Sequence, residues 1–309
     1  MKKTTVSIRN SAYPHPSGTA PWFEMDANNK VDSTDTIHFS GANGFPAAGS
    51  ASVLEQFRDT HTISGMENRG AWVERQLPPE KFSMNAFADD LISGLSSQFQ
   101  SPIIGMGHSH GGQVTMIAAL KRPELFSKLV IIEAASLPNP YIDLIYRKLP
   151  KAALFKIFPF MRGSETRRKV WPSRAAFIER YSTHPTFKLF TKTALEEYAQ
   201  HGLFEREDGK FELVFDPRWE SHIFRNIEFM WKFLRKTTHP TLLIRAEHSN
   251  TYSSKQFNQN NKKLPANVYA IEIPKTNHFL PQEDPELTAK YISAWLDETG
   301  SASWISNYI

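Results

Sequence analysis

The chain has 309 residues, with 36 Lys and Arg against 32 Asp and Glu, 40% apolar residues and no cysteine. A chain of this length can bury a large core, and its composition excludes collagen-like, disulfide-stapled and low-complexity proteins. Because cysteine is absent, thiol nucleophiles, iron–sulfur clusters and zinc–thiolate sites are excluded as well.

The N-terminal residues MKKTTVSIRN contain two lysines but no apolar segment behind them, which is unlike a secretory signal. No stretch approaches the roughly 20 apolar residues that a membrane-spanning helix needs. We therefore expect a cytoplasmic protein with no membrane span.

Short apolar segments separated by helical patterns run along most of the chain. Strands are predicted at 36–40, 61–64, 103–106, 129–132, 242–244 and 268–273. Apolar residues at helical spacing occur between them, around 87–95, 114–120 and 287–295. This alternation is typical of βαβ units, so we predict an α/β fold built on a parallel sheet.

Between residues 136 and 240 the alternation stops. This segment has 19 basic and 12 acidic residues, a net charge of +7, whereas the remainder of the chain has a net charge of −3. It also contains 19 of the 38 aromatic residues, with helical stripes and little strand signal. We interpret it as a helical lid over the sheet, so that 1–135 and 241–309 form the core and 136–240 a cap domain.

The clearest motif is GHSHGG at 107–112, between the predicted strand 103–106 and a helix. A serine on a tight strand-to-helix turn is held in a strained conformation, and glycines two residues before and after it let neighbouring backbone approach. Its hydroxyl then projects above the sheet, where the helix N-terminus offers N–H groups to a developing oxyanion. We predict Ser109 as a nucleophile; a glycine-rich turn without chemistry is the alternative.

A serine nucleophile needs a general base, and in this arrangement the chain order is serine, acid, histidine. Among eleven histidines, His278 lies in the required place, in a loop at 274–281 between the strand 268–273 and the last helix. His108 and His110 flank Ser109, where adjacent side chains on a sharp turn point away from the hydroxyl. We expect these two to pack and hydrogen-bond around the turn.

The third group has two possible positions. After the strand 242–244 the sequence reads RAEHSN, and Asn250 stands where an aspartate is expected. An amide can orient an imidazole but cannot stabilise imidazolium by charge. The other position is the end of the strand 129–132, where Glu133 can reach the same histidine. We prefer Glu133, with Asn250 and Glu247 as alternatives and a purely structural carboxylate as the non-catalytic one.

An oxyanion hole needs a second N–H besides that of His110, the residue after the nucleophile. The segment SGANGFP follows the strand 36–40 and is rich in small residues, so its backbone can approach a substrate closely. We assign the Asn43 N–H to this role, with Ala42 and Gly44 as near alternatives.

In this order the segments SGANGFP, GHSHGG, RPELFSKLVIIE, RAEHSN and TNHFLPQEDPE make the chain resemble the α/β-hydrolase superfamily over nearly its whole length. The resemblance implies an eight-stranded, mostly parallel sheet with helices on both faces and a helical cap inserted after strand 6. It also implies Ser109 as nucleophile and His278 as base. The chain departs from the usual pattern at Gly41, where histidine often begins the oxyanion loop, and at Asn250, where aspartate is common.

Haloalkane dehalogenases resemble the chain in one further respect. Some of them place their catalytic glutamate at the end of strand 6, in a context similar to Ile132-Glu133-Ala134. This resemblance supports Glu133. Those enzymes and epoxide hydrolases use an aspartate nucleophile where this chain has Ser109, so neither activity is expected here.

These residues predict a serine hydrolase that uses no cofactor or metal and cleaves carboxylic esters of small molecules through an acyl-enzyme on Ser109. A C–C bond hydrolase of meta-cleavage products, a thioesterase or a lactonase could use the same residues. A catalytically silent binding protein on a hydrolase scaffold is the alternative from another class, and only Asn250 favours it. We expect a monomer or a homodimer.

The predicted lid has two further features. Its aromatic residues suggest an apolar acyl pocket, with core packing as the stronger alternative: Phe155, Phe158, Phe160, Trp171 and Trp231. Its basic residues between 147 and 174 have only Glu165 as a counter-charge, so they could steer anionic substrates or form a solvated helix face.

Nucleic-acid binding is not expected, because the basic excess is confined to the lid and no stacking or phosphate-loop motif accompanies it. The tail at 300–309, with Trp304, Ile305 and Tyr308, could pack on the body or on a partner.

Overall fold

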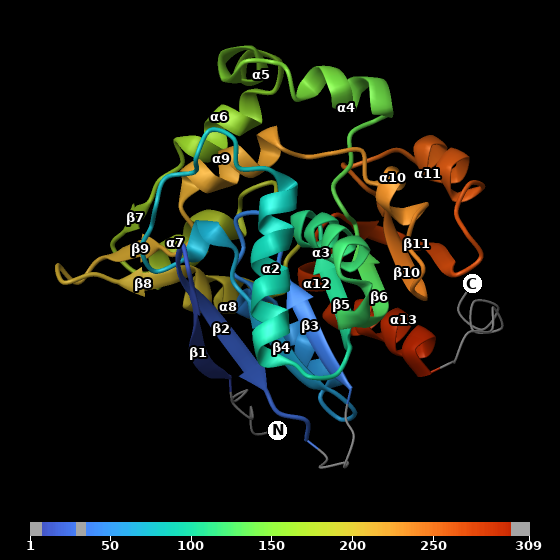
Figure 1. Ribbon diagram of the computed structural model, residues 1–309. Helices are drawn as coiled ribbons and strands as arrows, with labels where there is room; N and C mark the ends of the chain where they lie inside the picture. The colour runs from blue at the N-terminus through green and yellow to red at the C-terminus, as the bar shows by residue number, and fades with distance from the viewer. Residues whose placement is uncertain (1–7, 29–34, 298–309) are drawn as a thin grey trace.

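The computed structural model describes residues 8–28 and 35–297, so the tail at 300–309 lies outside the described part. An eight-stranded sheet forms its centre (Figure 1), with the strand order β1-β2-β4-β3-β5-β6-β10-β11. The strands are β1 (Arg9–His15), β2 (Gly18–Met25), β3 (Thr36–Ser40), β4 (Thr62–Met66), β5 (Ile103–His108), β6 (Phe126–Ile132), β10 (Thr241–His248) and β11 (Val268–Asn277).

Six of these strands run parallel to one another, and β1 and β2 form an antiparallel hairpin that joins β4 at one edge. The predicted eight-stranded, mostly parallel sheet is therefore confirmed. The central strands are buried on both faces, which explains why their sequences are continuous apolar runs rather than alternating ones.

Helices cover both faces of the sheet. One face packs against α2 (Met84–Gln98), α3 (His110–Lys121), α10 (Trp231–Leu234) and α11 (Ser254–Asn261). The other packs against α1 (Ala51–Leu54), α12 (Leu280–Glu283) and α13 (Pro285–Asp297). Neighbouring residues of one strand face opposite cores: Ile131 packs with the first set and Ile132 with the second. In Figure 1, α2 and α3 lie in front of the sheet.

Short 3-10 turns connect several elements: η1 (Ala47–Ser50), η2 (Glu55–Phe57), η3 (Arg69–Ala71) and η4 (Pro123–Leu125).

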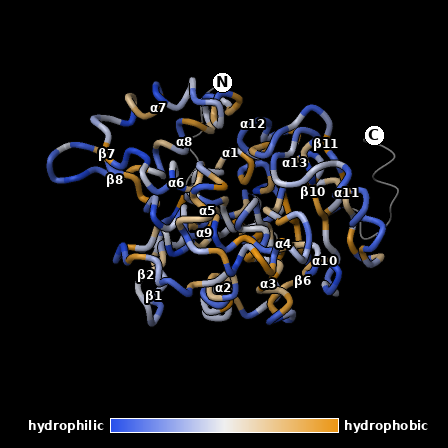
Figure 2. Tube along the Cα trace, turned by 90° about the horizontal axis from the view of Figure 1, so that it is seen from above, coloured by the Kyte–Doolittle hydropathy of each residue, from blue (hydrophilic) through white to orange (hydrophobic). Residues whose placement is uncertain are grey.

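Within the segment between β6 and β10, α4 (Pro140–Tyr146), α5 (Lys151–Ile157), α6 (Pro159–Glu165) and α9 (Pro217–Arg225) lie above the strand ends in Figure 1, and in the view from above (Figure 2) α5 and α9 lie over the middle of the molecule. The other helices of this segment besides α10 are α7 (Arg174–Ser182) and α8 (Lys192–Gly202). It also contains a small antiparallel sheet of β7 (Val170–Trp171), β9 (Phe211–Leu213) and β8 (Leu203–Glu205). The expected helices are present, whereas the small sheet was not predicted, because strands of two or three residues are too short to show a two-residue period.

Among residues 8–28 and 35–297, no helix combines the length and the apolar character needed to cross a bilayer.

Candidate active site

Ser109 occupies the single residue between β5 and α3. Its backbone has φ 55° and ψ −114°, a conformation that costs energy for any residue with a Cβ. The Ser109 N–H donates to the Ile132 carbonyl at 2.9 Å, and the Ser109 carbonyl accepts from Ala135 N–H at 3.3 Å. The strained residue is thus held by the neighbouring strand β6 and the turn that follows it.

Two glycines make this turn possible. A Cβ at Gly107 would lie 2.5 Å from the Gly111 carbonyl oxygen, and a Cβ at Gly111 would lie 2.0 Å from the Ser40 carbonyl oxygen. Both distances are far below van der Waals contact. Only glycine therefore fits two residues before and two residues after Ser109, because other backbone segments pass so close to these positions. The end of β3 therefore lies directly against the start of α3.

His278 follows β11 immediately, because the strand continues to Asn277 and does not end at 273 as predicted. Its Nε2 lies 3.1 Å from the Ser109 Oγ. The neighbouring His108 donates its Nε2–H to the His278 carbonyl at 2.8 Å, and burial lowers the pKa of His108 to about 3. His108 is therefore a neutral imidazole that fixes the backbone of His278, in agreement with its expected hydrogen-bonding role.

Glu133 is the first residue after β6 and is fully buried, with φ 45°. Its Oε2 lies 3.1 Å from the His278 Nδ1. The carboxylate also accepts hydrogen bonds from the Ala246 N–H at 2.7 Å and from the Ser249 hydroxyl at 2.8 Å. These donors replace water around the buried carboxylate and fix its orientation beside the imidazole.

The two alternative acids are placed elsewhere. The Glu247 carboxylate accepts from the Lys275 N–H at 2.7 Å, on the bend of β11 before His278. Asn250 is exposed to solvent. Its neighbours Ser249 and Thr251 instead direct their hydroxyls to Glu133, at 2.8 and 3.4 Å. The loop after β10 thus contacts the site through hydroxyls that orient the carboxylate.

The loop after β3 is clamped by the segment above the sheet. The Asn43 side-chain amide donates to the Glu220 carbonyl at 2.9 Å, and the Tyr198 hydroxyl donates to the Gly44 carbonyl at 3.1 Å. Gly44 has φ 81°, and a Cβ there would lie 3.0 Å from the Glu220 carboxyl group. The side-chain amide nitrogen of Asn43 therefore anchors the loop to the segment above the sheet.

A buried ion pair supports this clamp. The Arg167 Nη2 lies 2.9 Å from the Glu220 carboxylate, and the Arg167 Nη1 donates to the Tyr198 hydroxyl at 3.3 Å. Burial raises the pKa of Tyr198 to about 12, so its hydroxyl stays protonated and can donate to Gly44. The Tyr198 ring also stacks on Phe45 at a centroid distance of 4.5 Å.

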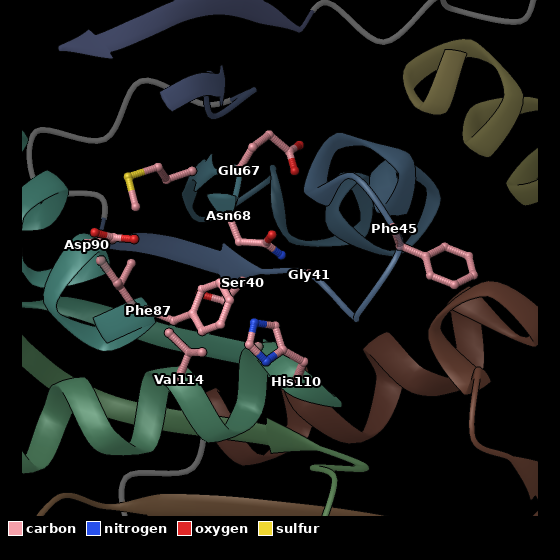
Figure 3. Close-up of a pocket in the computed structure, with 12 residues that line it drawn as sticks. Ser40, Gly41, Phe45, Glu67, Asn68, Phe87, Asp90, His110 and Val114 are labelled. Atoms are coloured by element: carbon pink, nitrogen blue, oxygen red, sulfur yellow. The ribbon is translucent and has the colours of Figure 1, made fainter. Parts of the chain in front are cut away.

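His110, the first residue of α3, lies beside a cavity of about 30 Å³ (Figure 3). The cavity lies between the end of β3, α2 and the start of α3, and is large enough to admit water. Burial lowers the pKa of His110 to about 3, and its ring packs edge-on against Phe87 at 4.8 Å. A neutral imidazole in this position contributes packing, while the backbone N–H at the helix N-terminus has no partner within the helix.

Besides the buried Asp90, this cavity is lined by a second buried carboxylate, Glu67, which lies across it from His110 (Figure 3). It accepts from the Ala47 N–H at 2.8 Å, at the start of η1 just after the loop 40–46. Burial raises the pKa of Glu67 to about 7. Sequence reasoning missed Glu67, because a single glutamate after a short strand has no distinguishing pattern.

The aromatic residues suggested for an acyl pocket take other positions. Trp171 and Trp231 are buried in two different cores, Phe160 is exposed, and none of the five suggested residues lines the cavity beside His110. The phenylalanines that do line it are Phe87 on α2 and Phe45, which lies on the predicted oxyanion loop. The contact of Tyr198 with the loop after β3 could not be predicted from the sequence, because Tyr198 lies far along the chain in a helix of ordinary amphipathic pattern.

The comparisons with known proteins agree on one family. The model of the alpha/beta hydrolase family matches residues 46–291. A 2-(acetamidomethylene)succinate hydrolase from Mesorhizobium japonicum is 22% identical over 246 residues, covering 79% of this chain and 82% of its own. The crystal structure of E-2-(acetamidomethylene)succinate hydrolase superposes with a TM-score of 0.76 at 18% identity, over 94% of this chain and all of the other.

A second similar structure is the thioesterase domain from the curacin biosynthetic pathway, with a TM-score of 0.70 at 12% identity, over 93% of this chain and 99% of the other. At these identities the structural likeness shows the fold alone.

Proposed function

Because the chain belongs to the alpha/beta hydrolase family, we propose that it is a serine hydrolase that cleaves carboxylic esters, with Ser109, His278 and Glu133 as its catalytic triad. The observation that carries the proposal is the continuous hydrogen-bond chain from the Ser109 Oγ to the His278 Nε2, and from the His278 Nδ1 to Glu133, with 3.1 Å at each step. This is the arrangement in which an imidazole can remove a proton from a serine hydroxyl.

In the acylation step, His278 accepts the Ser109 proton while the serine oxygen attacks the ester carbonyl carbon. The imidazolium formed on His278 is stabilised by the negative charge of Glu133, which lies against its Nδ1–H. The tetrahedral intermediate then collapses, and His278 gives the proton to the departing alcohol. Water attacks the acyl-enzyme in the same way, again with His278 as base, and releases the carboxylic acid.

The oxyanion of each tetrahedral intermediate is proposed to accept hydrogen bonds from the backbone N–H groups of Asn43 and His110. His110 is at the N-terminus of α3, where helical N–H groups lack internal acceptors. Contact of the loop after β3 with the start of α3, and the clamp by Tyr198 and Glu220, support a fixed position for Asn43.

Residues 136–240 are proposed to act as a cap that binds the acyl or alcohol part of the substrate. The segment is anchored near the site at several points. The Gln113 amide donates to the carbonyls of Ala135 and Glu228 at 2.6 and 2.7 Å, and the Thr191 N–H donates to the Gln282 carbonyl at 3.0 Å. These contacts join the residue before the segment and the C-terminal part of the segment to α3, and its middle to α12.

A thioester is the second candidate bond. One similar fold is named a thioesterase domain, and a thioester carbonyl would react at the same groups with a thiol as leaving group. Carbon–carbon and lactone hydrolysis use the same nucleophile and remain in the substrate series to be assayed.

The proposal is tested by assaying purified wild type and Ser109→Ala with p-nitrophenyl acetate through p-nitrophenyl dodecanoate, with acyl thioesters of matched chain length, and with a meta-cleavage dienoate. Turnover of the oxyesters that the substitution removes supports an esterase, and the chain-length optimum measures the pocket beneath the cap. Hydrolysis of oxyesters that Ser109→Ala retains in full would contradict the assignment. Turnover of the thioesters or the dienoate alone would replace the ester assignment while keeping Ser109.

A further inference from the structure

The outer face of helices α4, α5 and α6 exposes large apolar side chains. Tyr141 is 80% exposed and Leu144 59% exposed, so neither is covered by the chain. The exposed apolar residues of this face are Tyr141, Ile142, Leu144, Ile145, Ile157 and Phe160. We call these six residues, with the basic residues described below, the cap outer face.

Helix α4 is oriented opposite to an ordinary surface helix. Its buried residues are Asp143 and Tyr146, and its four aliphatic and aromatic neighbours face solvent. Asp143 is held inside by Lys232, at 3.0 Å, and by Arg147, at 2.8 Å. A helix that buries an aspartate and exposes isoleucine and leucine loses hydrophobic stabilisation, which indicates that another apolar phase covers its outside.

The core beneath this face is too small to account for the exposed residues. It consists of four buried side chains, to which the three helices contribute Tyr146, Leu154 and Met161. The Phe160 ring packs by its edge on Phe224 at a centroid distance of 5.1 Å, but the ring itself stays exposed. The three helices are thus fixed to one another while their apolar surface points outward.

Exposed basic residues lie in the same stretch of chain as these apolar side chains. Lys148, Lys156 and Arg162 are exposed, and in the part of the chain that the structure describes none of them has a carboxylate within ion-pair distance. The two acidic residues of the same helices are already neutralised, Asp143 as described and Glu165 by Lys151 at 2.7 Å. The cap outer face therefore combines exposed apolar groups with uncompensated positive charge.

This face is also the outermost part of the molecule. In Figure 1, α4 and α5 form the layer farthest from the sheet, above the strand ends. We propose that the cap outer face docks on an anionic lipid surface, with its apolar side chains inserted among the headgroups and acyl chains and its lysines and arginine against the lipid phosphates. Both features are what interfacial binding requires: apolar insertion and attraction to negative headgroups.

A second copy of the chain fits this face less well. In a two-fold contact the same patch meets itself, so Lys148, Lys156 and Arg162 would approach like charges. An acidic protein partner would match the charge but would need a groove complementary to side chains that project from three separate helices. A fluid anionic surface adapts to projecting side chains without such a match.

The test is sedimentation of the full chain, carrying Ser109→Ala so that no lipid is hydrolysed, with vesicles of phosphatidylcholine alone or with part of it replaced by phosphatidylglycerol. We expect binding to the anionic vesicles that weakens as salt increases. The double variant Leu144→Ser/Ile145→Ser should weaken partitioning about thirtyfold, because each side chain is a little over half exposed and so contributes roughly 1 kcal/mol of burial, or about fivefold. The variant Lys148→Glu/Lys156→Glu should weaken it by a similar factor, at about 1 kcal/mol per basic residue removed.

Leu77→Ser and Lys263→Glu are the matched controls. Leu77 is exposed to the same degree as Leu144, at 58%, and lies outside the cap, while Lys263 lies at the end of α11. Both controls should bind as the parent does, and all variants should melt at similar temperatures.

Absence of binding to anionic vesicles would overturn the proposal, as would equal binding to neutral vesicles or equal binding by the variants and the controls. A concentration-dependent dimer that Leu144→Ser/Ile145→Ser converts to monomer, without vesicle binding, would assign the face to a second copy instead. Binding does not depend on Ser109, so this outcome and that of the esterase assay are independent.

Discussion

The strand ends at Ser109 and Glu133 differ from the cap outer face in how many partners their residues find within the chain. At these strand ends, two residues with positive φ are held by hydrogen bonds from β6, β10 and the loop after β10. On the cap outer face, six apolar side chains are 39–80% exposed, and among the residues that the structure describes three basic side chains have no carboxylate within ion-pair distance. The contrast teaches that the strand ends form a closed unit whose geometry the fold determines, whereas the outer face is open to something outside the chain.

Ser109→Ala should have the largest effect on activity. Without the hydroxyl there is no nucleophile, so we expect kcat for a p-nitrophenyl ester to fall by about 10⁴-fold or more, to the background that the oxyanion donors alone provide. The thermal midpoint should change little, because among residues 8–28 and 35–297 the Ser109 Oγ has His278 as its only hydrogen-bond partner. A variant that keeps most of the wild-type kcat would show that another residue is the nucleophile.

Glu133→Gln tests which carboxylate serves His278. The substitution removes the charge beside the His278 Nδ1–H and places an amide against the Ala246 N–H, so we expect kcat to fall by roughly 10²- to 10⁴-fold. Asn250→Ala is the matched control, since Asn250 is exposed, and should stay within about twofold of wild type. A loss confined to Asn250→Ala would assign the role to the loop after β10.

Glu67→Gln tests the second buried carboxylate near the site. Its pKa is raised from 4.5 to about 7, so the folded state favours the neutral acid. The stability that this group contributes is therefore complete below pH 4.5 and is lost as pH rises through about 7. Relative to Glu67→Gln, the wild type should lose roughly 3 kcal/mol of unfolding free energy across this range. Urea unfolding of both proteins at a series of pH values measures it, and parallel pH profiles would refute the assignment.

Leu144→Ala should have the smallest effect. Leu144 is exposed on α4, so the free energy of unfolding should change by less than about 0.5 kcal/mol. Leu154→Ala on the neighbouring helix α5 should cost about 2–5 kcal/mol, because Leu154 is buried in the small core beneath the same face. Equal losses in thermal or chemical unfolding would mean that Leu144 is covered within the chain.

The sequence predicted the parts of the molecule whose cause is local. The turn at Ser109 follows from glycine spacing and from a strand and a helix on either side, and the parallel sheet follows from its apolar runs. Glu133 was preferred over Asn250 because it ends the strand next to that of Ser109, and the structure brings it to His278. The hydroxyls of Ser249 and Thr251 that orient Glu133 were not foreseen, since nothing in RAEHSNT distinguishes them from ordinary loop residues.

Other features could not be predicted, either because their local sequence resembles a loop or because they depend on distant pairing. The hairpin of β1 and β2 contains two prolines, Pro14 and Pro21, which disfavour strands unless they lie at an edge. The extension of β11 to Asn277 contains Lys275 with φ 57°, which resembles a turn in sequence. The clamp of Gly44 by Tyr198 joins residues 154 positions apart.

The pairing of β5 with β6 also has a consequence for the order in which the chain folds. The Ser109 backbone is held by the adjacent strand β6 and the turn after it, so the serine turn can form as soon as β5 and β6 associate. Glu133, in contrast, gains its partners Ile244 and Ala246 only when β10 joins the sheet. His278 lies 169 residues beyond Ser109 and reaches it only after the long insertion has folded and β11 has joined the sheet. During synthesis the chain should therefore carry an assembled but inert serine turn, and hydrolysis should begin only when the final strand is in place.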